Sequence, residues 1–182
     1  MRAIAVLTAS AGLLLAACGG TPPKEAPAAV KGAMGVARLM PKNGSTVRGF
    51  ISFTQSGDKV AVAGDFYELF PGSHSIYIHE GGNCSSPNAA SAGPVWNVPG
   101  NTGKRTGALP ELFAGTEGRA NISTSLKTIS VGTGKPDDVM GRSVVIYADV
   151  EADPKAEFGV PNGRLACGVI QPSTGLDLKK LL

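Results

Sequence analysis

Apolar and polar side chains alternate with a period of two in several short stretches of this 182-residue chain. Residues 47–54 are the clearest case, since Ile51 and Phe53 lie two positions apart between polar neighbours. This spacing predicts a half-buried β-strand, because successive side chains of a strand point to opposite faces of a sheet. A turn at residues 56–58 and a second apolar stretch at 59–64 complete a predicted hairpin.

The same signals predict five further strands, which are separated by glycine and proline residues: 36–40, 75–79, 120–124, 143–148 and 165–170. No window of ten or more residues carries the apolar stripe of a helix. Two long connections remain, near residues 83–117 and 149–162. The pattern is therefore typical of an all-β domain, an antiparallel sandwich or barrel with two long loops.

The chain begins with a segment that we expect to be removed. Residues 1–17 combine a basic start with a short apolar run, which is the layout of a secretory signal peptide. The run ends in Leu-Ala-Ala before Cys18, which reads as a lipobox and makes Cys18 the predicted site of lipid attachment. The alternative is an ordinary signal peptide that ends near a cysteine. Gly19 follows the cysteine, which in a Gram-negative cell is compatible with sorting to the outer membrane. The expected location is the outer membrane facing the periplasm, although no residue specifies which side the domain faces.

The rest of the chain divides into three parts. Residues 18–34 are rich in Pro, Ala and Gly and are interpreted as a flexible tether. Residues 35–171 form the predicted β domain, and residues 172–182 form a tail. The formal net charge is +3, and no dense basic cluster occurs, so the sequence does not indicate a nucleic-acid partner. The predicted membrane attachment is instead through the lipid on Cys18.

The chain has three cysteines, and two of them remain once Cys18 is assigned to the lipid. In an oxidising compartment, Cys84 and Cys167 are expected to form a disulfide. The alternative is a pair of thiolate ligands to a metal. That alternative lacks partners, because a closed site needs more Cys or His ligands than the chain can supply beside them.

Five segments carry a resemblance to a known family: residues 47–60 (VRGFISFTQSGDKV), 69–80 (LFPGSHSIYIHE), 91–94 (SAGP), 141–146 (GRSVVI) and 163–170 (GRLACGVI). In this order and spacing they resemble the copper/zinc superoxide dismutase family, in its bacterial lipoprotein form. The resemblance implies a Greek-key β-sandwich or barrel of about eight antiparallel strands. It also implies a copper site and a zinc site beside the two long loops.

Most of the metal ligands that the resemblance implies are replaced. Of four copper-binding histidines, only His79 matches, since the other positions hold Tyr77, Val95 and Tyr147. The stretch that would supply a zinc-binding histidine and aspartate instead holds Arg105 and Ala108 at those two positions. The chain has only two histidines in all. Zinc binding is therefore not expected.

Three residues match family positions: His79, His74 and Arg164. His79 and Arg164 each have two interpretations, and His74 has one. His79 is either a hydrogen-bonded relic, partnered by Tyr77 or Tyr147, or a residual copper ligand. His74 matches a family histidine that bridges backbone groups, and we expect a structural role. Arg164 matches the arginine that guides the anionic substrate; here it is either a vestige of that role or a residue that stabilises a loop through backbone carbonyls.

The sequence thus predicts a lipid-anchored envelope protein that keeps the dismutase fold without its metal centre or activity. Such a protein would act as a binding or scaffold protein, with no predicted cofactor. Two alternatives remain open at this stage: a dismutase with altered copper coordination, and an envelope carrier of metal or haem. The sequence does not identify a protein or small-molecule partner, and it leaves both a monomer and a homodimer open.

Overall fold

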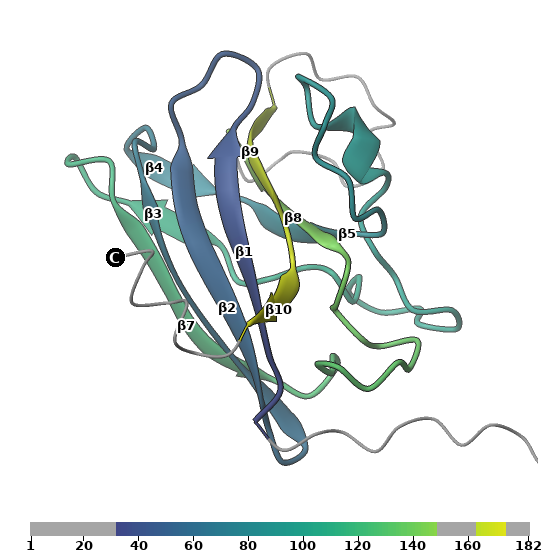
Figure 1. Ribbon diagram of the computed structural model, residues 1–182. Helices are drawn as coiled ribbons and strands as arrows, with labels where there is room; N and C mark the ends of the chain where they lie inside the picture. The colour runs from purple at the N-terminus through teal and green to yellow at the C-terminus, as the bar shows by residue number, and fades with distance from the viewer. Residues whose placement is uncertain (1–31, 149–162, 174–182) are drawn as a thin grey trace, which may run out of the picture.

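The computed structural model describes residues 32–148 and 163–173 (Figure 1). The signal segment, Cys18, the loop at 149–162 and most of the tail lie outside these residues. The described strands are β1 (Met34–Pro41), β2 (Arg48–Ser56), β3 (Lys59–Tyr67), β4 (Gly72–His74), β5 (Ile76–His79), β6 (Leu112–Ala114), β7 (Ala120–Leu126), β8 (Ser143–Tyr147), β9 (Arg164–Val169) and β10 (Gln171–Ser173). A single 3₁₀ turn, η1 (Ala90–Ala92), is the only helical element among the described residues.

Eight strands form one antiparallel sheet, in the order β5-β8-β9-β1-β2-β3-β7, with β10 paired to β1. The short strands β4 and β6 form a second, two-stranded sheet. Figure 1 shows the large sheet curling around its own concave face, as a half-barrel does. After β3 the chain passes through β4 to the edge strand β5. It then returns through β6 to β7 at the opposite edge, and crosses again to β8 beside β5. The prediction of an all-β, antiparallel fold of about eight strands is confirmed.

The concave face of the sheet holds the main hydrophobic core. In β3 every second residue is buried, and Val60, Val62 and Phe66 point inward between exposed neighbours. Phe53 of β2 lies opposite Val62 in the register and is fully buried. Burial of this apolar area is the main stabilising contribution to such a domain, at roughly 25 cal/mol per Å² removed from water. The period of two in the sequence therefore marks the core correctly.

Three strands were not expected from the sequence: β4, β6 and β10, each of three residues. A segment this short cannot display a period of two, so no pattern signals it. β10 pairs residue by residue with the start of β1, with Met34 opposite Ser173. The sheet thus reaches two residues past position 171, where we expected the domain to end.

The edge strand β5 separates its side chains between the two faces of the sheet. Ile76 and Ile78 are buried in the main core, so Tyr77 and His79 lie on the opposite, convex face. On the neighbouring strand β8, Tyr147 lies on that same convex side. A second, smaller core forms here under the first long loop, from Ala89, Ala92, Val145 and Cys167. The convex face of β5 and β8 is therefore covered by a loop and not by solvent.

The free edge of β5 is covered by the same long loop. The amide of Ile78 donates to the carbonyl of Gly107 at 2.8 Å, and its carbonyl accepts from the amide of Trp96 at 3.0 Å. The approach at Gly107 requires glycine, because a Cβ there would overlap the carbonyl oxygen of Ile78. These bonds satisfy the backbone of an edge strand that would otherwise be open to pairing with another chain.

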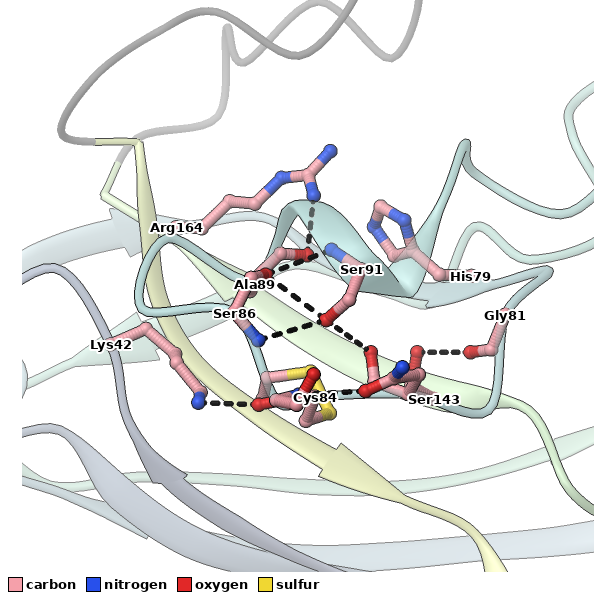
Figure 2. Close-up of a disulfide and its surroundings, with 12 residues drawn as sticks. Lys42, His79, Gly81, Cys84, Ser86, Ala89, Ser91, Ser143 and Arg164 are labelled. Carbon is pink, nitrogen blue, oxygen red and sulfur yellow. Dashed lines mark hydrogen bonds between the residues drawn. A yellow bond between two sulfur atoms is a disulfide. The ribbon is translucent and has the colours of Figure 1, made fainter.

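A disulfide fixes the start of this loop to the sheet. Cys84 and Cys167 are bonded, with their Cα atoms 5.7 Å apart, which confirms the predicted pair (Figure 2). The ammonium group of Lys42 donates to the carbonyl oxygen of Cys84 at 2.5 Å, and adds a second attachment beside the disulfide. The loop that covers the convex face is thus held at a covalent anchor point.

Candidate functional site

His79 lies at the centre of the convex-face cluster and is fully buried. Its Nδ1 is 2.8 Å from the carbonyl oxygen of Gly93. Because a carbonyl oxygen only accepts hydrogen bonds, Nδ1 carries the proton and Nε2 keeps its lone pair. The hydroxyl of Tyr147 lies 3.1 Å from Nε2 and donates to it. The ring nitrogen that would bind a metal in the neutral imidazole is therefore already hydrogen-bonded within the protein.

Burial keeps both members of this pair neutral. Desolvation lowers the pKa of His79 from 6.5 to about 4, although the Gly93 carbonyl acts in the opposite direction. Burial also raises the pKa of Tyr147 above its ordinary value of 10, against the opposing positive charge of Arg164. At neutral pH the site therefore holds a neutral imidazole and a protonated phenol.

The positions that the family resemblance pointed to do come together in space. The ring of Tyr77 meets that of Tyr147 edge-on, with centroids 5.6 Å apart. In backbone pairing, buried Val95 lies opposite His79, and Ala108 lies opposite Tyr77. Tertiary structure thus gathers Tyr77, Val95, Ala108 and Tyr147 near His79.

Arg105 lies to one side of this cluster. It lines a pocket of about 340 Å³ together with Tyr77, Lys104 and Glu111. Within the described parts of the chain, no acidic side chain forms a salt bridge with Arg105. The position expected for the zinc ligands therefore presents a cation at the wall of a pocket.

Arg164, the first residue of β9, spans the gap between the sheet and the loop. Its Nη1 donates to the carbonyl oxygen of Ala89 at 2.7 Å, as Figure 2 shows. Its guanidinium carbon lies 5.7 Å from the centre of the Tyr147 ring. The bond to Ala89 is the kind of contact that a loop-stabilising arginine makes.

His74, at the end of β4, is buried away from the convex-face cluster. Its Nδ1 lies 2.9 Å from the carbonyl oxygen of Tyr147, and its Nε2 lies 2.8 Å from that of Phe70. Both ring nitrogens thus face backbone acceptors. This arrangement connects β4 to the end of β8 and leaves no nitrogen of His74 for a ligand.

The residues present do not fit a copper–zinc centre. Copper and zinc sites of this kind are built from imidazole nitrogens and a carboxylate, each offering a lone pair to the metal. Here Val95 has no lone pair, and the Nε2 lone pair of His79 accepts a hydrogen bond from Tyr147. Among the described residues, no three His, Cys, Asp or Glu side chains lie together as a metal-binding group.

Sequence reasoning missed one contact that organises the site, the bond from His79 to Gly93. Gly93 belongs to the SAGP segment, but the acceptor is a backbone carbonyl, which every residue possesses. A positive φ of 76° at Gly93 sets the local direction of the chain there. No side-chain pattern announces such a contact.

The sequence and the fold of this chain are similar to those of known proteins. The sequence model of copper/zinc superoxide dismutase (SODC) matches residues 47–170, more than half of the chain. The chain belongs to the copper/zinc superoxide dismutase family. A superoxide dismutase [Cu-Zn] from Onchocerca volvulus is 34% identical over 145 residues, which cover 70% of this chain and 90% of that protein.

Other relatives show the same relationship at similar distance. The extracellular superoxide dismutase [Cu-Zn] of Brugia pahangi is 30% identical and covers 77% of this chain and 76% of its own. A bacterial superoxide dismutase [Cu-Zn], from Caulobacter vibrioides, is 29% identical and covers 68% of this chain and 78% of its own. Among solved structures, the clock protein EA4 matches with a TM-score of 0.63 and 27% identity, covering 78% of this chain and 96% of its own.

Proposed function

We propose that this member of the copper/zinc superoxide dismutase family neither binds the dinuclear metal centre nor dismutes superoxide, and acts in the cell envelope as a binding or scaffold protein. One observation carries the proposal: the Nε2 lone pair of His79 accepts a hydrogen bond from Tyr147, which stands in a copper-ligand position. Tyr147 thus has two effects: it supplies no imidazole, and its hydroxyl occupies the free lone pair of His79, the one matching copper-ligand histidine.

The chemistry of the reaction supports this proposal. Dismutation alternately oxidises and reduces superoxide, and the redox cycle belongs to the metal, not to the amino-acid side chains. An altered copper site would need ligands from His79, Tyr77, Tyr147 and His74. Both nitrogens of His74 face backbone carbonyls, and the pKa of Tyr147 is raised by burial, which disfavours the phenolate that copper prefers.

The envelope location rests on the start of the chain. We infer that Cys18 is lipidated after removal of residues 1–17 and that residues 18–34 tether the domain to the outer membrane. The Cys84–Cys167 disulfide supports an oxidising compartment such as the periplasm. In the described ranges, no helix is long and apolar enough to cross a membrane.

The deciding experiment measures metal content and superoxide loss in the same preparation. The processed protein is loaded with copper and zinc, dialysed, and analysed by mass spectrometry of its metals and by the decay of pulsed superoxide. We expect copper and zinc far below one ion per chain and no acceleration of superoxide decay. Stoichiometric copper with fast dismutation would falsify the proposal.

A matched variant tests whether the replaced side chains are the cause. In Tyr77→His/Val95→His/Tyr147→His, three imidazoles return to the positions around His79. We expect this variant to retain copper where the unmodified chain does not, because four nitrogen donors suit copper. If the variant folds and still binds no copper, the replacements at these three positions do not explain the loss.

A further inference from the structure

We propose that Tyr147 and His79 form a proton-coupled one-electron donor, which reduces small diffusible radicals of the peroxyl class. The proposal goes beyond the function given above and requires only that Nε2 of His79 carries no metal. It assigns a chemical activity to the side chains that replaced the copper site.

The geometry of the pair fits proton transfer during oxidation. The phenolic oxygen of Tyr147 lies 3.1 Å from Nε2 of His79, and the hydroxyl proton lies between them. The opposite nitrogen, Nδ1, is fixed by its bond to Gly93, so the acceptor lone pair is held toward the phenol. Loss of an electron turns a phenol into a strong acid, and a neutral imidazole at hydrogen-bond distance is the proton acceptor it needs.

The step balances with a radical as the oxidant. A peroxyl radical takes one electron from Tyr147, whose O–H bond breaks as its proton moves to Nε2 of His79. The products are a hydroperoxide anion, a neutral tyrosyl radical and an imidazolium. The hydroperoxide anion then takes a proton from water and leaves a hydroxide ion, which balances the charge of the imidazolium. The tyrosine is thus oxidised by one electron and the peroxyl radical is reduced by one.

The surroundings favour a coupled step over loss of an electron alone. An electron lost without the proton would leave the positive charge on a half-buried phenol ring, with no hydrogen bond to the ring to offset it. The positive charge of Arg164, 5.7 Å from that ring, opposes a charge on either side chain, so the hydrogen bonds decide between the two. Moving the proton places the charge on an imidazole whose two N–H groups are both satisfied, by Gly93 and by the Tyr147 oxygen. A buried charge is tolerated only when it is hydrogen-bonded in this way.

Tyr77 connects the pair to the surface. It lines the pocket of about 340 Å³ and is half-buried, and its ring contacts Tyr147 edge-on at 5.6 Å between centroids. A radical that enters the pocket can therefore reach Tyr77, whose ring contacts that of Tyr147.

The test generates azide radicals by pulse radiolysis in the metal-free full chain, treated with chelator, and follows the tyrosyl radical by absorbance and by freeze-quench electron paramagnetic resonance. The chain has three tyrosines, so single Phe variants separate them. We expect Tyr147→Phe to lose the long-lived tyrosyl signal. Tyr67→Phe is the matched control, because the Tyr67 ring lies under the guanidinium of Arg119, the residue before β7, and neither histidine bonds to it; it should keep the signal.

His79→Gln tests the role of the proton acceptor separately. Glutamine fills a similar volume and accepts a hydrogen bond, but it is not a base. We expect the radical at Tyr147 to form at least about tenfold more slowly, with a changed solvent isotope effect. An unchanged rate in His79→Gln, or a full signal in Tyr147→Phe, overturns the proposal. Chelation keeps this result separate from the metal-loading test, so either proposal can fail alone.

Discussion

At the scale of single residues, His79 shows how burial decides the behaviour of a side chain that the sequence leaves ambiguous. Its ring is completely buried, and both nitrogens are hydrogen-bonded, one to a backbone carbonyl and one to a phenol. The neutral imidazole of His79 suits both hydrogen bonds, because it has one N–H to donate and one lone pair to accept. Protonation of Nε2 would require the Tyr147 hydroxyl to turn and accept from it, and would place a positive charge in a buried site.

A pH dependence of stability follows. The pKa of His79 is about 4 in the folded protein and 6.5 as its ordinary value. The unfolded chain therefore binds more protons between these values, and stability falls as the pH drops from about 6.5 to 4. The full difference corresponds to roughly 3 kcal/mol in the free energy of unfolding. Urea titrations at several pH values measure it.

His79→Gln supplies the control for that measurement. This variant has no ionisable group at position 79, so its free energy of unfolding should change less between pH 6.5 and pH 4 than that of the unmodified chain. Equal slopes in the two proteins would show that other groups, such as the carboxylates, cause the pH dependence.

At the scale of elements, the first long loop is part of the sheet's structure. It hydrogen-bonds along the edge of β5, covers the convex face and is attached by the disulfide. Arg164 of β9 reaches the same loop at Ala89. Ala89 and Ala92 of the loop pack against Val145 and Cys167 in the smaller core, so the loop forms a packed layer over the sheet.

A substitution at Gly107 tests the contact between the loop and Ile78 at the edge of β5. In Gly107→Ala the new Cβ would overlap the carbonyl oxygen of Ile78, so the loop or β5 must shift. We expect a loss of roughly 1–3 kcal/mol in the free energy of unfolding. Gly103→Ala is the matched control, because its Cβ meets only a side-chain oxygen of Asn101 at 3.6 Å; its effect should stay within about 0.5 kcal/mol. Thermal and urea unfolding compare the two.

Removal of the Cys84–Cys167 disulfide is expected to destabilise the domain. It links residues 83 positions apart, and removal of such a long cross-link raises the entropy of the unfolded chain. We expect Cys84→Ala/Cys167→Ala to lose about 2–5 kcal/mol in the free energy of unfolding. Hydrogen exchange should increase most in the loop that begins at Cys84. Uniform loosening of the whole sheet would contradict the role of the disulfide as a loop anchor.

At the scale of the whole molecule, the chain has the fold of its family, while the positions that the family resemblance assigns to copper ligands hold Tyr77, Val95 and Tyr147. The main core on the concave face contains neither Tyr77 nor Tyr147, although Trp96 and Leu109 of the first long loop pack in it. The side chains of Tyr77, His79 and Tyr147 lie on the convex face, under the part of the loop that carries Ala89 and Ala92. Substitutions at these convex-face positions therefore leave most of the hydrophobic core, which directs folding, unchanged.

Membrane attachment is a property of the whole chain, and Cys18 is its predicted anchor. We expect the protein to incorporate labelled palmitate and to fractionate with outer membranes when produced in a Gram-negative cell. Cys18→Ala should lose the label and become soluble or remain unprocessed, because the acyl chains supply the membrane affinity. Label retained in Cys18→Ala would place the modification elsewhere.

The sequence by itself determined the class of fold, because a period of two is a direct consequence of strand geometry and marks Phe53 and Val62 as core wherever the chain pairs. It also showed that the side chains of Val95 and Ala108 carry no donor atom for a metal in any conformation. Only the tertiary structure decided the state of His79. Its partners, the Gly93 carbonyl and the Tyr147 hydroxyl, lie 14 and 68 positions away, and no local pattern reports on a bond that exists only after β5, β8 and the loop have packed together.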